Sequence, residues 1–260
     1  MRGLTEEAAG VAIEVATRVL HLPTVRASAD ELAAAAVRDR LTHRAYLAEL
    51  LAAEVEDRES RRRERRIAEA RFPRTKHLAE FDLGATPTIE PAVLGTLAQG
   101  AWITAGEPVV LLGDSGTGKT HLLIGLGMAA CERGLRVRYV TAAALVNELV
   151  EAEDERELSK VVARYGRIDL LCLDELGYLH LDRRGAELLF QVLTERDERA
   201  SIAVASNAPF SEWGQTFIDP RLAAAVVDRL TFRAHILETG SSSYRLRTSQ
   251  AKRKEAPPAA

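Results

Sequence analysis

One stretch of the sequence has the residue types and spacing of a phosphate-binding loop. Residues 113–120 read Gly-Asp-Ser-Gly-Thr-Gly-Lys-Thr, which fits G-x-x-x-x-G-K-[ST] at every fixed position. The glycines let successive N–H groups turn toward an anion, the lysine adds a positive charge, and the threonine hydroxyl suits Mg²⁺. An apolar run at 109–112 and a helical stretch from Thr120 to Glu132 flank the motif, which disfavours the alternative of a chance glycine-rich turn. The candidate nucleotide-binding residues are Gly113, Asp114, Ser115, Gly116, Thr117, Gly118, Lys119, Thr120 and His121.

A second candidate group is the acidic pair Asp174-Glu175. It ends the segment 168–173, which is apolar except for Asp169. A buried strand that ends in Asp-Glu places both carboxylates at the carboxyl edge of a sheet, beside the phosphate loop. Asp174 is then a candidate to hold Mg²⁺ through its water shell, and Glu175 to polarise the attacking water. The alternative is that the two acids cap the following helix.

Polar and basic residues near the end of the chain could complete a hydrolytic site. Asn207 follows the apolar run 202–205 and could bond the γ-phosphate or the attacking water, or else cap a loop. Arg221, Arg229 and Arg245 could stabilise transition-state charge, either in the same subunit or from a neighbour. Surface salt bridges are the alternative for each of these arginines.

These residues must be positioned by a sheet. Short apolar runs alternate with helical stretches along the second part of the chain, which is typical of a parallel sheet covered on both faces by helices. We therefore expect an α/β fold of the P-loop type over residues 95–248, preceded by a small all-helical module at 1–75 and a linker at 76–94. The tail at 249–260 is expected to be disordered. The expected strands are 109–112, 137–140, 170–173, 202–205 and 235–237.

The first 75 residues show helix signals only. Thr5 precedes two acids and is expected to cap a first helix, which Pro23 ends. Ser28 to Glu31 has the spacing of a capping box and is expected to begin the second helix.

The helical module ends in a basic run. Residues 61–76 contain eight basic and two acidic side chains, and such a cluster can neutralise phosphates of duplex DNA. A solvated helical face with i,i+4 pairs is the alternative, and no aromatic residue interrupts the arginine-rich part at 61–66 to stack on bases. The candidate DNA-binding residues are Arg61, Arg62, Arg63, Arg65 and Arg66.

Composition narrows the possible classes of function. The net charge of −3 favours no partner class, and 47% hydrophobic residues suit a globular core. Cys131 and Cys172 have no metal-ligand or CxxC spacing, the six histidines are scattered, and no apolar stretch approaches the length needed to cross a bilayer. We expect a cytoplasmic protein with free thiols and no Cys/His metal centre.

The motifs in this order resemble those of an AAA+ ATPase, and more narrowly the IstB-like ATP-binding helpers of insertion-sequence transposases, which are related to the DnaC helicase loaders. Beyond the phosphate loop, the resemblance covers almost the whole chain and rests on these pieces: Leu22-Pro23-Thr24, 46–54, Ala70-Arg71-Phe72-Pro73, Phe81-Asp82, 174–179, 206–214, Asp228-Arg229-Leu230 and 243–246.

The resemblance implies an ATPase that assembles as a homo-oligomer on duplex DNA and assists an IstA-like transposase. It assigns Lys119 to ATP, Thr120 and Asp174 to Mg²⁺, and Glu175 to hydrolysis. It makes Asn207 the first sensor. Arg229 becomes the arginine finger offered to a neighbouring subunit, and Arg245 a nucleotide-contacting second sensor.

Three other functions remain open at the level of sequence. A helicase loader of the DnaC type would share every motif and differ in the partner bound by the helical module. A P-loop kinase for a small molecule would need a substrate pocket and a lid, and would not require the Asp-Glu pair. An ATP-gated adaptor that clamps DNA would differ only in its rate of hydrolysis.

Overall fold

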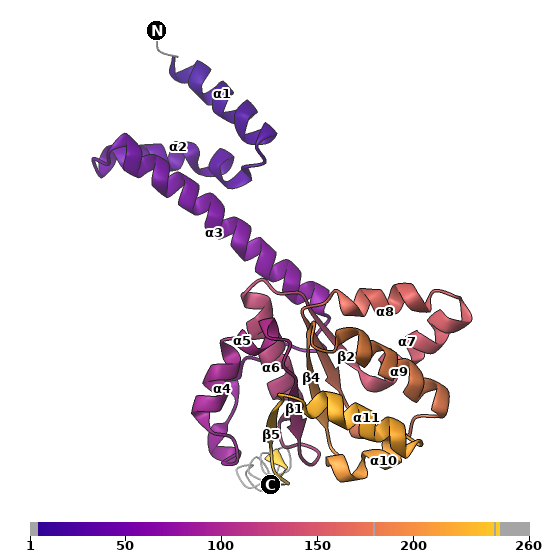
Figure 1. The fold of residues 1–260 in the computed structure, drawn as a ribbon. Helices are drawn as coiled ribbons and strands as arrows, with labels where there is room; N and C mark the ends of the chain where they lie inside the picture. The colour runs from indigo at the N-terminus through magenta and orange to yellow at the C-terminus, as the bar shows by residue number, and fades with distance from the viewer. Residues whose placement is uncertain (1–4, 179, 242, 245–260) are drawn as a thin grey trace, which may run out of the picture. The chain divides into compact units, whose positions relative to one another are not determined.

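The computed structural model describes residues 5–178, 180–241 and 243–244, and it divides the chain into two compact units between Arg65 and Arg66. The first unit contains α1 (Glu6–Val19), α2 (Pro23–Arg38) and most of α3 (His43–Ala70), whose last residues belong to the second unit (Figure 1). No helix in the described ranges has the length and apolar character needed to cross a membrane.

The first two helices begin for different reasons: α1 is capped by the residue before it, whereas the start of α2 is stabilised by a residue distant in sequence. Thr5 caps α1 as predicted, because its hydroxyl accepts a hydrogen bond from Ala8 N at 3.4 Å. The prediction that the second helix begins at Ser28 was wrong, since α2 begins at Pro23. Proline suits the first helical position, and the buried carboxylate of Glu54 accepts from the backbone N–H of Thr24 at 2.8 Å. Because Glu54 lies 30 residues from Thr24, the residues around the start of α2 contain no sequence pattern that would reveal this cap.

The core of the first unit is small. Its buried members are Val25, Ala29 and Leu50, with Leu22, Leu32 and Tyr46 packed around them. A core of this size provides limited hydrophobic stabilisation, so the cap by Glu54 matters more than it would in a larger unit.

The second unit is a five-stranded parallel sheet with the order β2-β3-β4-β1-β5. The five predicted strands are all present, as β1 (Val109–Leu112), β2 (Val137–Thr141), β3 (Leu170–Asp174), β4 (Ser201–Ser206) and β5 (His235–Glu238). The helices of this unit are α4 (Pro91–Ala98), α5 (Ala101–Thr104), α6 (Lys119–Glu132), α7 (Ala142–Asp154), α8 (Leu158–Gly166), α9 (Arg183–Arg196), α10 (Trp213–Thr216) and α11 (Pro220–Thr231). Short 3-10 turns are η1 (Leu78–Glu80), η2 (Leu83–Ala85), η3 (Leu176–Tyr178) and η4 (Phe210–Glu212).

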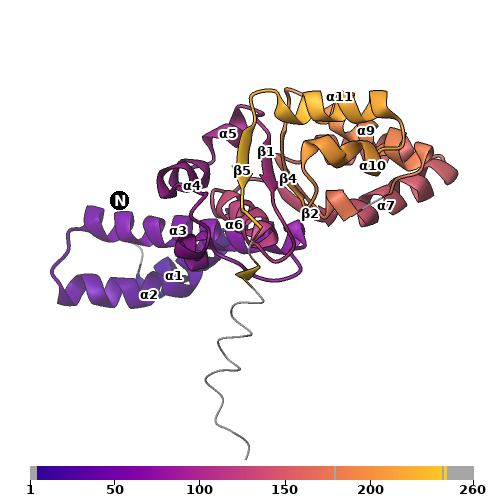
Figure 2. The same cartoon turned by 90° about the horizontal axis from the view of Figure 1, so that it is seen from below.

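Alternate residues of each central strand enter two separate cores. In β1, Val110 and Leu112 belong to one core, whereas Val109 and Leu111 belong to the other. The first core lies under α7, α8, α9 and α11, and the second under α4, α5 and α6, on the opposite face of the sheet (Figures 1 and 2). Burial on both faces explains why the strands read as continuous apolar runs, and it confirms the predicted fold class.

Residues 76–94, expected as a linker, are part of the second unit. Leu78, Phe81 and Leu83 pack against the core under α6, and Ile89 and Leu94 are fully part of it. The unit also begins earlier than residue 95, because Ile67 and Ala70 pack in the same core. The segment has no helical or strand periodicity, and its scattered apolar residues are therefore easily mistaken for a connection.

Arg196, at the end of α9, is a buried cation that joins the amino ends of two strands. Its guanidinium donates hydrogen bonds to the carbonyl oxygens of Tyr165, Ile168 (2.9 Å), Asp169 and Ser201. Burial lowers the pKa of Arg196 to about 10, so the side chain stays charged at neutral pH. One side chain therefore links four backbone carbonyl groups before β3 and at the start of β4.

We expect Arg196→Met to destabilise the protein by about 3–5 kcal/mol, because it strands buried carbonyl groups without a donor. The matched control is Arg199→Met, since Arg199 is exposed and its loss should change stability by about 0.5 kcal/mol or less. Denaturant unfolding of the two variants measures the difference, and equal effects would contradict the structural role of Arg196.

Candidate nucleotide-binding site

The phosphate loop connects β1 to α6 and has a backbone that requires glycine at two close approaches. Gly113 has a φ of 148°, and a Cβ there would lie 2.3 Å from the Thr239 hydroxyl oxygen. Gly118 has a φ of 103°, and a Cβ there would lie 2.7 Å from the Phe81 ring. A side chain at Gly113 would displace Thr239, and one at Gly118 would displace Phe81. The two glycines therefore allow the loop to turn sharply and also allow these neighbouring residues to pack against it.

The loop is hydrogen-bonded to the chain that follows β5. Thr239 N donates to Leu112 O at 2.8 Å, and Asp114 N donates to Gly240 O at 3.0 Å. Farther along, Tyr244 N donates to Gly116 O at 3.1 Å. The two hydroxyls of Thr117 and Thr239 are 2.6 Å apart and buried. The end of the described chain therefore forms one wall of the loop.

Lys119 begins α6, and its ammonium group lies inside the loop. Its Nζ donates to Gly113 O at 2.6 Å and to Asp114 O at 2.7 Å, and the side chain is buried. These carbonyl groups fix a positive charge where the first turn of α6 also presents backbone N–H groups. The arrangement suits a phosphate.

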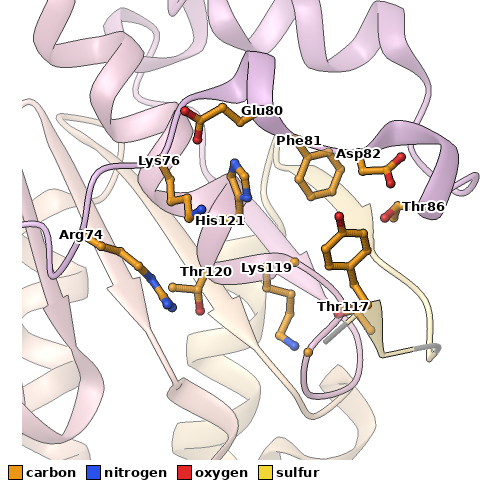
Figure 3. Close-up of a pocket in the computed structure, with 13 residues that line it drawn as sticks. Arg74, Lys76, Glu80, Phe81, Asp82, Thr86, Thr117, Lys119, Thr120 and His121 are labelled. Atoms are coloured by element: carbon orange, nitrogen blue, oxygen red, sulfur yellow. The ribbon is translucent and has the colours of Figure 1, made fainter. Parts of the chain in front are cut away.

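A cavity of about 310 Å³ opens beside the loop (Figure 3). It is lined by Arg74, Lys76, Glu80, Phe81, Asp82, Thr86, Gly116, Thr117, Gly118, Lys119, Thr120, His121 and Tyr244. The sequence predicted the loop residues but not those at 74–86, because Arg74 was assigned to the helical module and residues 76–86 to a linker. The apolar residues Phe72, Leu78, Phe81 and Leu83 were the signal that could have identified this segment, because a solvent-exposed linker is usually polar.

His121 joins the two sides of this cavity. Its Nε2 donates to the carbonyl oxygen of His77 at 2.9 Å, and its ring meets the Phe81 ring edge to face at 5.5 Å. The first turn of α6 is therefore fastened to the segment before η1, and an aromatic wall forms between them. A flat apolar group such as a nucleotide base fits beside such a wall.

Asp174 ends β3 and is held by two hydrogen bonds. The Tyr139 hydroxyl donates to Oδ2 at 2.8 Å, and Glu175 N donates to Oδ1 at 2.9 Å. Burial and the Asp174 charge raise the pKa of Tyr139 well above its ordinary value, so the phenol remains a donor. Tyr139 was missed from sequence, where it is one residue within an apolar strand.

The register of the sheet brings the predicted polar residues to one edge. Leu112 pairs with Ser206 and Thr141 pairs with Asp174, so Gly113, Asn207 and Glu175 all follow neighbouring strand ends. Glu175 has a φ of 63°, an uncommon conformation for a residue with a side chain and one that is concentrated at functional sites. Asn207 Oδ1 is buried and has no hydrogen-bond partner among the described residues.

Of the predicted arginines, Arg229 does not join this edge. Arg229 donates to Asp197 Oδ2 at 3.1 Å and stacks on the Phe190 ring, 4.3 Å from its centroid. Asp197 precedes β4, so Arg229 lies at the amino edge of the sheet, opposite the phosphate loop. Arg221 is exposed in the first turn of α11. Arg245 lies outside the described residues.

The predicted DNA-binding arginines differ in their surroundings. Arg61 pairs with Asp57 on the same helix, and Arg62 and Arg65 are exposed, whereas Arg63 is half-buried. Arg66 donates to Gly134 O at 3.3 Å and to Glu69 at 2.9 Å, so it is attached to the α/β unit. Arg66 is therefore less available to a ligand than the others.

Comparison with known proteins identifies the family. The model of the IstB-like ATP binding protein family matches residues 15–252 of this sequence. The chain belongs to this family. An insertion sequence ATP-binding protein of Sinorhizobium fredii is 37% identical over 93% of this chain and 82% of that protein. The IS21 ATP-binding protein of Pseudomonas aeruginosa is 36% identical over 90% of this chain and 89% of its own length. The resemblance found in the sequence is confirmed.

The family membership agrees with the fold. DnaA from Aquifex aeolicus, solved with bound AMPPCP, aligns at a TM-score of 0.55 and 24% identity, over 69% of this chain and 55% of the DnaA chain. DnaI aligns at a TM-score of 0.53 and 19% identity, over 63% of this chain and 90% of that chain. The second unit has the fold of an AAA+ domain, and the protein belongs to a family of ATP-binding proteins.

We expect Gly177→Ala to disturb the position of Asn207. A Cβ at Gly177 would lie 2.4 Å from Asn207 Oδ1 and 2.8 Å from the backbone nitrogen of Ala208, and such overpacking costs about 1–3 kcal/mol. Gly214→Ala is the control, because a Cβ at Gly214 meets no atom within 4 Å in a helix. Thermal unfolding should show a lower Tm for Gly177→Ala alone, and an unchanged Tm would contradict the close contact.

Proposed function

We propose that this protein hydrolyses ATP with Mg²⁺, assembles on duplex DNA and assists the transposase of its insertion sequence. The observation that carries the hydrolysis proposal is the convergence of the phosphate loop, Asp174-Glu175 and Asn207 at one edge of the sheet. A binding loop alone needs neither the acidic pair nor the asparagine. Their presence supports a site that also cleaves the γ-phosphate.

The oxygen donors beside Lys119 fit a magnesium ion. Mg²⁺ is usually bound by one or two protein oxygens together with substrate phosphates and water. Thr120 lines the cavity, and Asp174 retains lone pairs beyond the two that Tyr139 and Glu175 N occupy. When bound, Mg²⁺ neutralises charge on the phosphate oxygens.

The remaining roles follow from the positions of the side chains. Glu175 is exposed at the strand edge, where its carboxylate can accept a proton from the attacking water. Asn207 lies between the ends of β3 and β1, where its amide can orient that water or bond the γ-phosphate. Lys119 exchanges its bonds to the loop carbonyls for phosphate oxygens when ATP binds.

Arg229 is proposed to act on the ATP of a neighbouring subunit. Its place at the amino edge of the sheet prevents it from reaching the phosphate loop of its own chain. An arginine that is supplied in trans makes hydrolysis depend on assembly, and removal of such a group costs a large factor in rate. Arg221 is the second candidate for this role, and Arg245 for a contact with the nucleotide in the same chain.

The DNA-binding proposal rests on the basic face of α3. Arg58, Arg61, Arg62 and Arg65 recur at i, i+3, i+4 and i+7, so they share one side of the helix, whereas Arg63 lies on the other side. A cavity of about 340 Å³ in the first unit adjoins this face, lined by Thr17, Arg18, His21, Leu22, Pro23, Arg26, Glu54, Arg58 and Arg61. Its one lining carboxylate, Glu54, is already bonded to the start of α2. The surface therefore favours phosphate groups.

The transposase proposal rests on the similarity to insertion sequence ATP-binding proteins. A DNA strand-transfer assay with an IstA-like transposase tests it directly. Stimulation should need ATP, and no stimulation would contradict the assigned partner while leaving ATP hydrolysis intact.

We expect Glu175→Gln to lower kcat for ATP hydrolysis by about a hundredfold or more, because the general base is lost. Nucleotide affinity should remain within about twofold, since the amide keeps the size of the carboxyl group. Glu151→Gln on α7 is the control, because Glu151 is an exposed acid outside the cavity. Normal hydrolysis by Glu175→Gln would contradict the role of Glu175.

We expect replacement of Arg61, Arg62 and Arg65 by Gln to weaken duplex DNA binding and to reduce the slope of log K against log salt. Each lost phosphate contact reduces the slope by about 0.9. Arg63→Gln removes the same charge from the other side of α3 and should change the slope by less per residue. Equal changes per arginine would show that general charge, and no particular face, governs binding.

A further inference from the structure

The segment 71–82 crosses the nucleotide cavity and carries two cations into it. Arg74 and Lys76 line the cavity together with Lys119 and Thr120. In Figure 3 the guanidinium end of Arg74 points toward Thr120, and Lys76 extends toward His121. Both cations come from chain that precedes the phosphate loop by about forty residues, so the loop motif does not include them.

The segment is fastened on both sides of these cations. Phe72 packs against Tyr139, with ring centroids 6.2 Å apart, and His77 O accepts the hydrogen bond from His121. Leu78 lies so close to α6 that a Cβ at Gly125 would be 2.7 Å from its side chain. Arg74 is therefore held over the site by its neighbours in sequence, while its own side chain is exposed.

Arg74 lies on the side of the cavity nearer to Tyr139 and Asp174. Its charge opposes the rise in the pKa of Tyr139, whose hydroxyl donates to Asp174. Within the described ranges, no acidic side chain forms an ion pair with Arg74 or Lys76. The cavity is lined by three cations and two carboxylates: Arg74, Lys76 and Lys119, and Glu80 and Asp82. The excess positive charge suits a polyphosphate.

We propose that Arg74 binds the terminal phosphate of ATP from within the same chain, and that this contact distinguishes ATP from ADP. The proposal rests on ATP binding at Lys119. A guanidinium is suited to this because its fork of N–H donors binds two phosphate oxygens at once. Thr120 and Asp174 are the candidate Mg²⁺ ligands, so the γ-phosphate end of the nucleotide lies on the side that Arg74 faces. Lys76, beside His121, adds charge nearer the base.

Through this contact, binding of ATP could influence the conformation of the N-terminal unit. Arg74 follows the end of α3, at Ala70, by only four residues, and α3 continues into the first unit. A ligand can shift a conformational equilibrium only through contacts that differ between states. A bond from the γ-phosphate to Arg74 exists with ATP and is lost with ADP, so it adds one further contact to the segment 71–77 in the ATP state only.

Binding of AMPPNP and ADP, each with Mg²⁺, to the full-length protein tests the proposal by calorimetry. Arg74→Gln should weaken AMPPNP binding about tenfold, as expected for loss of a charged hydrogen bond, and change ADP binding by less than about twofold. Arg74→Lys should recover part of the loss, because the charge is kept and the fork is not.

Arg71→Gln is the matched control, since Arg71 is an exposed arginine of the same segment outside the cavity lining. It should leave both affinities unchanged. Equal weakening of AMPPNP and ADP by Arg74→Gln, or no change in either, would overturn the assignment to the terminal phosphate.

Hydrogen exchange provides a second measurement that does not depend on a variant. In the wild-type protein, amides of residues 71–77 should be protected more by AMPPNP than by ADP. Equal protection would contradict the proposed route to α3. Failure of the wild-type protein to bind either nucleotide would instead contradict the proposed function itself.

Discussion

The register of the three central strands is the constraint on which the site depends. β4 lies between β3 and β1, and both faces of these strands are buried in separate cores. A slip of one residue would move every apolar side chain to the other face, so the register cannot drift. The same register sets the three strand ends side by side, and Gly113, Asn207 and Asp174 meet without any loop having to carry them together. The residues of the candidate site are therefore positioned by core side chains that are not themselves part of the site.

The edge that the sheet provides is incomplete until other parts of the chain cover it. The residues after β5 bond to the phosphate loop, and the segment before α4 supplies one side of the cavity. Within the sheet, the Tyr139 hydroxyl on β2 holds the Asp174 carboxylate on the neighbouring strand β3 by a hydrogen bond. Such contacts restrict the rotamers of charged groups before a ligand arrives, which reduces the entropy lost on binding.

Much of this site could be predicted from sequence because its signals are local. The phosphate loop and the strand ending in Asp174 are continuous motifs, and their strands are apolar runs. The errors have a common physical cause, which is that the stabilising partner lies far away in sequence. Pro23 begins α2 because Glu54 caps it, and residues 76–94 are ordered because α6 lies beneath them. Tyr139 gains its role only through pairing with β3, which no local pattern reveals.

Arg229 and Arg74, two of the arginines proposed to contact a nucleotide, differ in their electrostatic surroundings. Arg229 is neutralised by Asp197 and stacked on Phe190, which holds the guanidinium in a defined place at the amino edge. That pair is partly exposed, and exposed ion pairs contribute only about 0–1 kcal/mol, so a phosphate from another subunit could replace Asp197 at low cost. Arg74 instead faces the cavity of its own chain without an acidic partner among the described residues. With the roles proposed above, a single chain binds ATP through Lys119 and Arg74, whereas Arg229, the arginine proposed to assist cleavage, lies at the amino edge of the sheet. Under that proposal, binding and cleavage are separated, and a subunit holds ATP until it meets a neighbour.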